Sequence, residues 1–257
     1  MQYVANRLPR HGVPTEFSSE YGLIQIDPAH APERALAYCF HNFVSHYLKS
    51  PLGRYITSRG MQGKIFVDIG ANLGMYSLLA RSVGAMAYMF EPEPSHVKFL
   101  ARNSTLLGSL FPIALSDRKG ELPLYYHPNN PGATSLVEAS GFIASDLTVR
   151  VDTFSEQRLD SEKLIELIKI DVEGNESRTV RGMEDFFERG NRPDIWCEVR
   201  GGAAERSPRS YAEVIEYLAK FGYEYYDGTV EPLRIPSPGF DALESRGVFD
   251  LLFVAPK

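Results

Sequence analysis

One short stretch constrains the fold of this chain more than any other. Residues 64–74 read KIFVDIGANLG: an apolar run ends in the acid Asp68, Gly70 and Gly74 follow, and a helical pattern begins directly afterwards. This order is typical of a strand that turns tightly into a helix beneath a bound cofactor. The stretch therefore predicts both a strand-turn-helix unit and a ligand site at its turn.

A second acid follows the next apolar run of the chain. Residues 86–90 (MAYMF) lead into Glu91, and Pro92 comes directly after it. In an open parallel sheet, ligands bind in the crevice at the carboxyl ends of the strands. We therefore expect Asp68 and Glu91 to line one crevice. The alternative is that Asp68 only caps the helix and that Glu91 lies on the surface.

The glycine spacing and the acids select among cofactors. A dinucleotide site uses G-x-G-x-x-G, because the middle glycine lets backbone amides approach a pyrophosphate. Here residues 70–74 give G-x-x-x-G, and Asp68 would add negative charge beside any phosphate. S-adenosylmethionine has no phosphate and carries an ammonium and a sulfonium. It fits better, because Asp68 can help to hold its amino acid end and Glu91 can accept hydrogen bonds from both ribose hydroxyls.

Apolar runs and helical patterns alternate from residue 64 onward. Alternating strands and helices predict an α/β fold, a Rossmann-like, doubly wound and mostly parallel sheet of about seven strands. No helical pattern separates the last two strands, so one of them can run antiparallel to the rest. The predicted strands cover 64–68, 86–90, 111–115, 120–126, 148–154, 167–171, 194–199, 222–226 and 248–254, and the predicted helices cover 73–83, 94–107, 175–189 and 211–221.

The length of 257 residues suits one large domain, or one domain with an appended cap. We assign residues 61–257 to the cofactor-binding domain and residues 1–60 to an N-terminal extension with a strand over 22–27 and an amphipathic helix over 32–49. That helix is aromatic enough to serve as a pocket cap or as the surface of a homo-oligomer. Residues 127–147 are polar and rich in Asn, Pro, Gly and Ser, which indicates a lid or binding loop.

Composition excludes several other classes of protein. The formal charge is −6 and no basic stripe is visible, which argues against a nucleic-acid partner. No apolar run is long enough for a membrane span, and the first residues lack the apolar core of a signal peptide. Cys39 and Cys197 lie far apart without metal-type spacing, as expected of buried thiols in a reducing compartment. We therefore expect a soluble cytoplasmic protein without a membrane partner.

Further polar residues follow the third predicted strand. Ser116 and Asp117 come directly after Ala114 and Leu115. If that strand ends at the same edge of the sheet, the Ser116 backbone or Asp117 can contact the adenine of the cofactor. The pattern D-x-x-G from Asp117 to Gly120 is equally typical of a plain β-turn. Both interpretations stay open at this point.

The distal strand 167–171 ends in paired acids. Asp171 follows the apolar run, and Glu173 stands two positions later at the turn into the next helix. Near a transferable methyl group they could deprotonate a hydroxyl, and they would be the ligands of a divalent ion if one is bound. A helix N-terminus stabilises a carboxylate and so weakens it as a base. The alternative is therefore that Asp171 caps the helix and Glu173 supports its first turn.

Residues on three other segments are candidates for binding the acceptor. Glu198 lies near the end of strand 194–199 and Arg200 directly follows it. Because strand side chains alternate with period two, both point to the same side, so they either orient a substrate or pair with each other. Thr134 and Ser135 in the polar segment are candidate substrate contacts. His127 has the ordinary pKa of a physiological base and is a third candidate for the catalytic base.

Six motifs between roughly residues 64 and 200, which include the two turns and the paired acids described above, occur in an order that resembles the FkbM-type family of S-adenosylmethionine-dependent methyltransferases. The resemblance implies a class I methyltransferase fold, methyl transfer to a hydroxyl of a sugar, polyketide or other small metabolite, and contacts of Asp68, Gly70, Asn72 and Glu91 with the cofactor. Residues 1–60 and 201–257 match poorly and would shape the acceptor pocket. The matching motifs are VDIGANLGMYSLLA (67–80), FEPEP (90–94), ALSDRKGE (114–121), GATSL (132–136), VRVDTF (149–154) and IKIDVEGNESRTVRG (168–182).

The sequence thus leads to an O-methyltransferase that acts on a small metabolite or sugar in a biosynthetic pathway. The alternatives are transfer to nitrogen or to a carboxylate, including one on a peptide, and a non-catalytic module that only binds the cofactor. The expected partner is a small-molecule acceptor. A requirement for a divalent metal is left open by the sequence.

Overall fold

The computed structural model describes residues 13–128, 130–138, 141–159, 164–200, 210–229, 242–243 and 245–255. Over these ranges the strands form sheets of two, seven and four strands. None of the helices in the same ranges is both long and apolar enough to cross a membrane.

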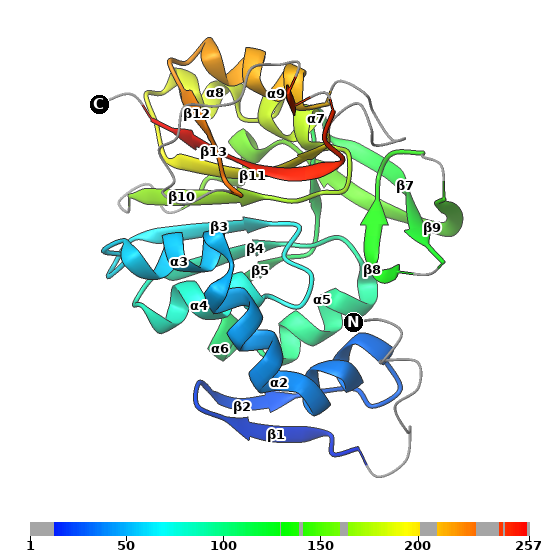
Figure 1. Cartoon of the computed structure of the whole chain (residues 1–257). Helices are drawn as coiled ribbons and strands as arrows, with labels where there is room; N and C mark the ends of the chain where they lie inside the picture. The colour runs from blue at the N-terminus through cyan, green and yellow to red at the C-terminus, as the bar shows by residue number, and fades with distance from the viewer. Residues whose placement is uncertain are drawn as a thin grey trace.

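The seven-stranded sheet is the centre of the molecule (Figure 1). β10, β11, β3, β4 and β5 are parallel, and β13 runs antiparallel to both of its neighbours. The prediction that one of the last two strands reverses is therefore confirmed. In spatial order the strands are β12 (Glu224–Asp227), β13 (Val248–Val254), β11 (Asp194–Arg200), β10 (Ile165–Ile170), β3 (Ile65–Ile69), β4 (Met86–Phe90) and β5 (Ser109–Phe111).

Side chains that alternate along the strands bury both faces of this sheet. On β3, Ile65, Val67 and Ile69 pack into one core layer, whereas Phe66 packs into the other. The first layer lies under α7 (Glu176–Arg181), α8 (Glu184–Glu188) and α9 (Ser210–Ala219), which Figure 1 shows above the sheet.

The second core layer joins the sheet to the N-terminal segment. Leu36, Phe40 and Val44 of the expected amphipathic helix are buried in it, so the described part of the extension shares a core with the sheet. The same layer includes residues of β2 and of the helices below the sheet in Figure 1. The elements on this side are β1 (Glu16–Ser19), β2 (Gly22–Gln25), α2 (Ala31–Lys49), α3 (Pro51–Ser58), α4 (Met75–Ser82), α5 (Pro94–Arg102) and α6 (Ser104–Leu107).

Two predicted helices are each divided in two. The helix predicted over 94–107 breaks at Asn103, whose side-chain amide donates to the carbonyls of Gln25 and Phe99. The helix predicted over 175–189 breaks at Gly182, where a Cβ would lie 2.0 Å from the carbonyl oxygen of Ser116. A tertiary contact causes each break, which is why the helical pattern alone did not indicate it.

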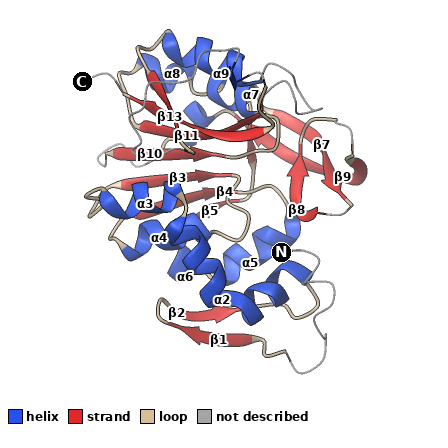
Figure 2. Cartoon of the chain, viewed as in Figure 1, coloured by secondary structure: helices blue, strands red, loops and turns tan. Residues whose placement is uncertain are grey.

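A separate four-stranded sheet lies beside the carboxyl end of the large sheet (Figure 2). Its strands are β6 (Ala114–Leu115), β7 (Gly120–His127), β8 (Asn130–Ser135) and β9 (Ile143–Asp152). The single strand predicted over 111–115 is wrong, because β5 and β6 belong to different sheets. Pro112 stands between them and has no backbone N–H to give to a ladder.

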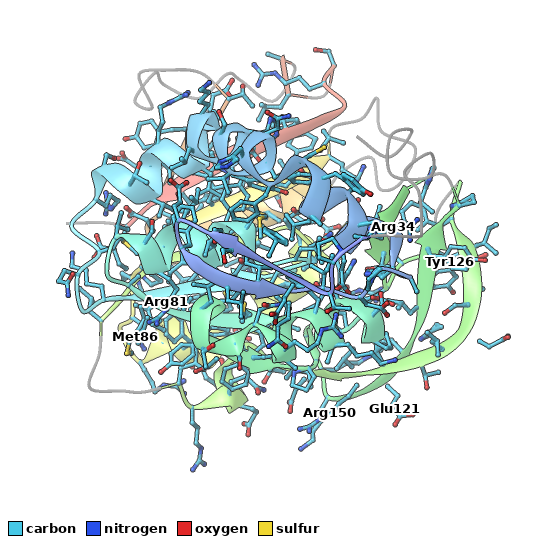
Figure 3. All side chains as sticks on the ribbon, turned by 90° about the horizontal axis from the view of Figure 1, so that it is seen from below. Arg34, Arg81, Met86, Glu121, Tyr126 and Arg150 are labelled. Carbon is cyan, nitrogen blue, oxygen red and sulfur yellow. The ribbon has the colours of Figure 1, made fainter. Side chains whose placement is uncertain are left out.

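The prediction of an irregular loop over 127–147 is also wrong. β8 and the first half of β9 occupy much of this range, and both pair antiparallel with β7. An antiparallel sheet with one solvent-exposed face needs few apolar residues. The polar composition of residues 127–147 therefore resembled that of a loop. Figure 3 shows Glu121, Tyr126 and Arg150 on this small sheet, where Glu121 and Arg150 are cross-strand partners and both exposed.

We expect the first core layer, which lies under α7, α8 and α9, to contribute much of the free energy of unfolding. Phe187 on α8 is 0% exposed, so Phe187→Ala should lower the free energy of unfolding by about 3–5 kcal/mol through lost burial and an unfilled cavity. Urea denaturation followed by circular dichroism measures this change. Leu164→Ala is the matched control, because Leu164 is 64% exposed, and an equal loss in both variants would contradict the assigned core.

Candidate cofactor and active site

A cavity opens at the carboxyl ends of β3, β4 and β10, between the large sheet and the small sheet. Its lining combines the two turns that the sequence singled out with an apolar wall from β6 and β7. Among the residues that line it are Gly70, Asn72, Glu91, His96, Ile113, Leu115, Leu124, Thr134, Ser135, Asp171 and Glu173.

The turn after β3 is shaped by backbone conformations that most residues avoid. Gly70 has φ 77° and Asn72 has φ 53°, both in the left-handed region. A Cβ on Gly70 would lie 1.8 Å from the carbonyl oxygen of Asp171, so only glycine lets the β3 and β10 turns approach this closely. The backbone amide of Asn72 consequently reaches the Glu91 carboxylate, at 2.8 Å from Oε2.

Glu91 lies at the cavity although it is only 4% exposed. Its Oε1 accepts the backbone N–H of Glu93 at 2.9 Å, and the imidazole of His96 lies 3.7 Å away. Burial by itself would raise the pKa of Glu91, but His96 and the amides of Glu93 and Asn72 outweigh it and hold the pKa below its ordinary value. A buried, ionised carboxylate therefore faces the cavity. The alternative of a surface residue is wrong.

Four predicted cofactor residues do not line the cavity. Asp68 is buried beneath the turn, where its Oδ2 accepts the hydroxyl of Ser77 at 2.7 Å. Gly74 precedes α4, and a Cβ there would press on Leu100 at 3.0 Å. Ser116 is buried and Asp117 is exposed, and β6 instead offers apolar side chains to the cavity. Direct cofactor contacts by these four residues stay predictions.

Lys169, which was not among the residues predicted from the sequence, holds the turns together. Its side chain is 4% exposed, and Nζ donates to the carbonyl oxygen of Gly70 at 2.7 Å. The same ammonium lies 3.3 Å from Oδ1 of Asp68 and 3.4 Å from Oδ2 of Asp171. Burial lowers its pKa, but the two aspartates outweigh this and raise the pKa, so Lys169 stays charged. A lysine within the otherwise apolar stretch IELIKI was the signal for it.

Asp171 and Glu173 both line the cavity, and each has a cationic partner. Asp171 pairs with Lys169, and Glu173, at φ 55°, accepts the guanidinium of Arg200. Glu198 was the partner that the sequence offered for Arg200, but among the described residues the carboxylate that Arg200 pairs with is that of Glu173. A cation beside a carboxylate weakens it as a base.

A row of three acids crosses the edge of the sheet beside the cavity. Asp171 directly follows β10, Glu198 lies next to it on β11, and Asp250 on β13 is the register partner of Glu198. Burial, reinforced by Asp171 and Glu173, raises the pKa of Glu198 to about 9. Burial and Asp171 raise the pKa of Asp250 to about 6. Asp250 was not identified from the sequence, because it lies inside an apolar strand.

The small sheet brings two of its three predicted residues to the cavity. Thr134 and Ser135 line it, and the Ser135 hydroxyl donates to the carbonyl oxygen of Glu173 at 2.7 Å. His127 lies farther along β7, where its ring packs edge-on against Phe142 at 5.4 Å, and it is not a lining residue. The structure therefore does not bring His127 together with Asp171 and Glu173.

No group of three or more His, Cys, Asp and Glu side chains in the described ranges is arranged to hold a metal ion. The cavity suits S-adenosylmethionine in its donor set. A buried carboxylate, a tight turn without phosphate-binding glycine spacing and an apolar wall match a ribose, a linkage that contains no phosphate and an adenine ring, respectively.

The strand order, the single reversed strand and this cavity define a class I S-adenosylmethionine methyltransferase fold. The chain belongs to the FkbM methyltransferase family, because the model of the methyltransferase FkbM domain matches residues 68–225.

Individual relatives are more distant. The chain is 29% identical over 155 residues to methyltransferase sdnD of Sordaria araneosa, a match that covers 46% of this chain and 60% of that protein. It is 28% identical over 157 residues to 31-O-demethyl-FK506 methyltransferase FkbM of Streptomyces tacrolimicus, covering 48% and 60%. The structure of a TehB-like methyltransferase from Corynebacterium glutamicum superimposes with a TM-score of 0.48 at 11% identity, covering 90% of this chain and 100% of that one.

Replacing the buried lysine tests its role in the site. Lys169→Met should lower the free energy of unfolding by about 3–5 kcal/mol, because the substitution leaves the Asp68 carboxylate buried without its cation. Chemical denaturation gives the change. Lys98→Met, at an exposed position of α5, should cost less than about 0.5 kcal/mol. Equal stability of Lys169→Met and the wild type would show that the ammonium does not organise the turns.

The row of acids predicts a pH-dependent stability. The folded pKa of Glu198 is raised from 4.5 to about 9, so between these values the folded protein holds a proton that the unfolded chain has lost. The stability from this group is therefore complete below about pH 4.5 and falls as the pH rises toward 9.

Glu198→Gln, which mimics the protonated side chain, should accordingly be more stable than the wild type at pH 8. We expect about 1–2 kcal/mol after allowance for solvent screening, and near equality at pH 4. Thermal unfolding across this pH range measures it. Glu121→Gln on the exposed face of β7 is the control. A gain that is the same at pH 4 and pH 8 would rule out the protonation mechanism.

Proposed function

We propose that the chain is an S-adenosylmethionine-dependent O-methyltransferase that acts on a hydroxyl of a small metabolite or sugar in a biosynthetic pathway. The observation that carries the proposal is the buried carboxylate of Glu91 at the cavity, ionised and fixed by two backbone amides. Each carboxylate oxygen keeps a second lone pair, so Glu91 can still accept the two hydroxyls of a ribose. The family supports the reaction class, and the aligned part spans about 60% of the relatives' length.

The bound cofactor would supply an electrophilic methyl group on its sulfonium. The chain would hold it by Glu91 at the ribose, by the backbone of Gly70 and Asn72 at the turn, and by the apolar wall of Ile113, Leu115 and Leu124 at the adenine. Such positioning alone can contribute several kcal/mol of barrier lowering.

The acceptor would approach from the side of Asp171 and the small sheet. Thr134 and Ser135 are the proposed contacts of the acceptor. Arg200, which pairs with Glu173, and Glu198 on the same strand are proposed to orient the acceptor from the side of the Glu173 turn. Tyr47 of α2 packs edge-on against Tyr76 at 4.8 Å, and Tyr76 lies 6.0 Å from the Lys169 ammonium. The N-terminal extension would therefore help to shape the acceptor pocket.

The acids at the carboxyl edge of the sheet would remove the proton from the acceptor hydroxyl. Asp171 lines the cavity, where its Oδ2 lies 3.4 Å from the Lys169 ammonium, and it stays our first candidate for the base. Asp250, whose pKa is raised to about 6, could receive the proton, whereas Glu198, which is protonated at neutral pH, could only pass a proton along the row. The cationic partners of Asp171 and Glu173 favour one other candidate, transfer to a carboxylate, because that acceptor is already ionised and needs no base.

Two substitutions separate binding from chemistry. Glu91→Ala should weaken the binding of S-adenosylhomocysteine at least about hundredfold, because it removes a charge-assisted acceptor and leaves two amides unpaired. Asp171→Asn should keep the binding within a few-fold and slow methyl transfer about 10²–10⁴-fold. Calorimetry and single-turnover transfer to hydroxyl acceptors measure the two effects.

The outcomes discriminate among the candidate functions. Unchanged binding in Glu91→Ala would refute the assigned cofactor site. Undiminished turnover in Asp171→Asn, Glu173→Gln and Asp250→Asn together would favour a carboxylate acceptor. Binding without transfer to any hydroxyl, amine or carboxylate acceptor would favour a non-catalytic cofactor-binding module.

A further inference from the structure

His96 is a buried imidazole at the cavity, and no hydrogen bond to its ring is found within the described ranges. It lies in the first turn of α5, lines the cavity and is 1% exposed. Neither Nδ1 nor Nε2 has a hydrogen-bonding partner in the part of the chain that the structure describes. Nδ1 lies 3.7 Å from Oε1 of Glu91 and 3.7 Å from Oε2 of Glu93, which is too long for a hydrogen bond.

The position does not need a histidine for the fold. The N-cap of α5 is satisfied by Glu93, whose Oε2 accepts the backbone N–H of His96 at 2.8 Å, and this bond is independent of the side chain. Nδ1 lies within ion-pair distance of two carboxylates, but burying Nε2 without a partner costs free energy that an apolar side chain would avoid. The imidazole is therefore best explained by a ligand that its nitrogens meet in the cavity.

The charges around His96 come from two elements. Glu91 and Glu93 face it from the β4–α5 turn, and Glu33 acts on it from α2. His30 lies beside it with ring centroids 5.8 Å apart. Burial lowers the pKa of His96, but the three carboxylates outweigh burial and raise the pKa above 6.5, which favours the protonated ring.

His30 cannot serve in place of His96. Its Nδ1 lies 3.0 Å from Oε1 of Glu33, and its Nε2 lies 3.1 Å from the hydroxyl of Ser95. Both of its nitrogens are thus engaged, Nδ1 with Glu33 of α2 and Nε2 with Ser95 of α5. Among the residues that the structure describes, Nε2 of His96 is therefore the imidazole nitrogen at the cavity that is left for a ligand.

We propose that His96 is a second binding residue for the adenosine part of the cofactor, donating a ring N–H to one of its oxygen or nitrogen acceptors while its imidazolium faces the Glu91 carboxylate. The proposal rests on the function proposed above. Glu91 accepts hydrogen bonds from hydroxyl groups, and His96 supplies the complementary donor beside it. Cofactor binding then depends on the protonation of His96 and weakens as the pH rises through the pKa of that residue.

Calorimetric titration of the full chain with S-adenosylhomocysteine, between pH 6 and pH 9, tests the proposal. In the wild type we expect the Kd to rise about tenfold over this range. Titrations in two buffers of different ionisation enthalpy should show proton uptake on binding at the alkaline end. His96→Phe should raise the Kd at least about tenfold at pH 6.5 and remove both the pH dependence and the proton uptake.

A second variant keeps the test decisive if the larger ring disturbs folding. His96→Gln retains an N–H donor but cannot titrate, so it should bind more tightly than His96→Phe and show no pH dependence. His41→Gln, at an exposed position of α2, should match the wild type in Kd and in pH profile. Circular dichroism verifies that each variant is folded before titration.

The failures of the two proposals are distinguishable. If the wild type binds S-adenosylhomocysteine but His96→Gln shows the same pH profile and proton uptake as the wild type, the role of His96 is overturned and the cofactor site stands. If the folded wild type does not bind this probe at any pH, the proposed function fails, and the assignment of His96 fails with it.

Discussion

A single buried ammonium fixes the geometry on which the site depends. Lys169 contacts the Gly70 carbonyl oxygen, Asp68 and Asp171, and so joins the end of β3 to the end of β10. An unpaired charge at that depth would be very costly, whereas two carboxylates and a carbonyl oxygen compensate it. The two turns that line the cavity are therefore held together by an interaction that lies beneath it.

The cofactor side of the cavity is preorganised by backbone rather than by flexible side chains. The left-handed conformations at Gly70 and Asn72 aim an amide at Glu91, and a second amide from the next turn fixes its other oxygen. Because the His96 imidazole and these amide donors are in place before any ligand arrives, Glu91 stays ionised despite its burial. Little ordering then remains to be done on binding.

The acceptor side has the opposite character. Asp171, Glu198 and Asp250 are like charges in adjacent strands, and their mutual repulsion and burial disfavour ionisation of Glu198 and Asp250. Such an arrangement costs stability at neutral pH, and acids with perturbed pKa values beside a cavity are a common feature of functional sites. The proposed cofactor thus binds at the preorganised turns, and the proposed acceptor lies on the side of the acids whose ionisation is disfavoured.

The amino-acid sequence was sufficient to predict the alternating strands and helices, the reversed strand and the two turns at Gly70 and Glu91. These features follow from local pattern, since period-two burial, glycine conformations and strand-end acids are encoded within a few residues. Only the tertiary structure decided which polar residues meet. In the structure, Asp68 lies beneath the turn, and Ser116, Asp117 and His127 do not line the cavity. Lys169, His96 and Asp250, which were not predicted, lie beneath, at and beside the cavity, respectively. The tertiary structure also formed strands from the polar segment 127–147, because backbone pairing across a sheet depends on partners far along the chain that local composition cannot specify.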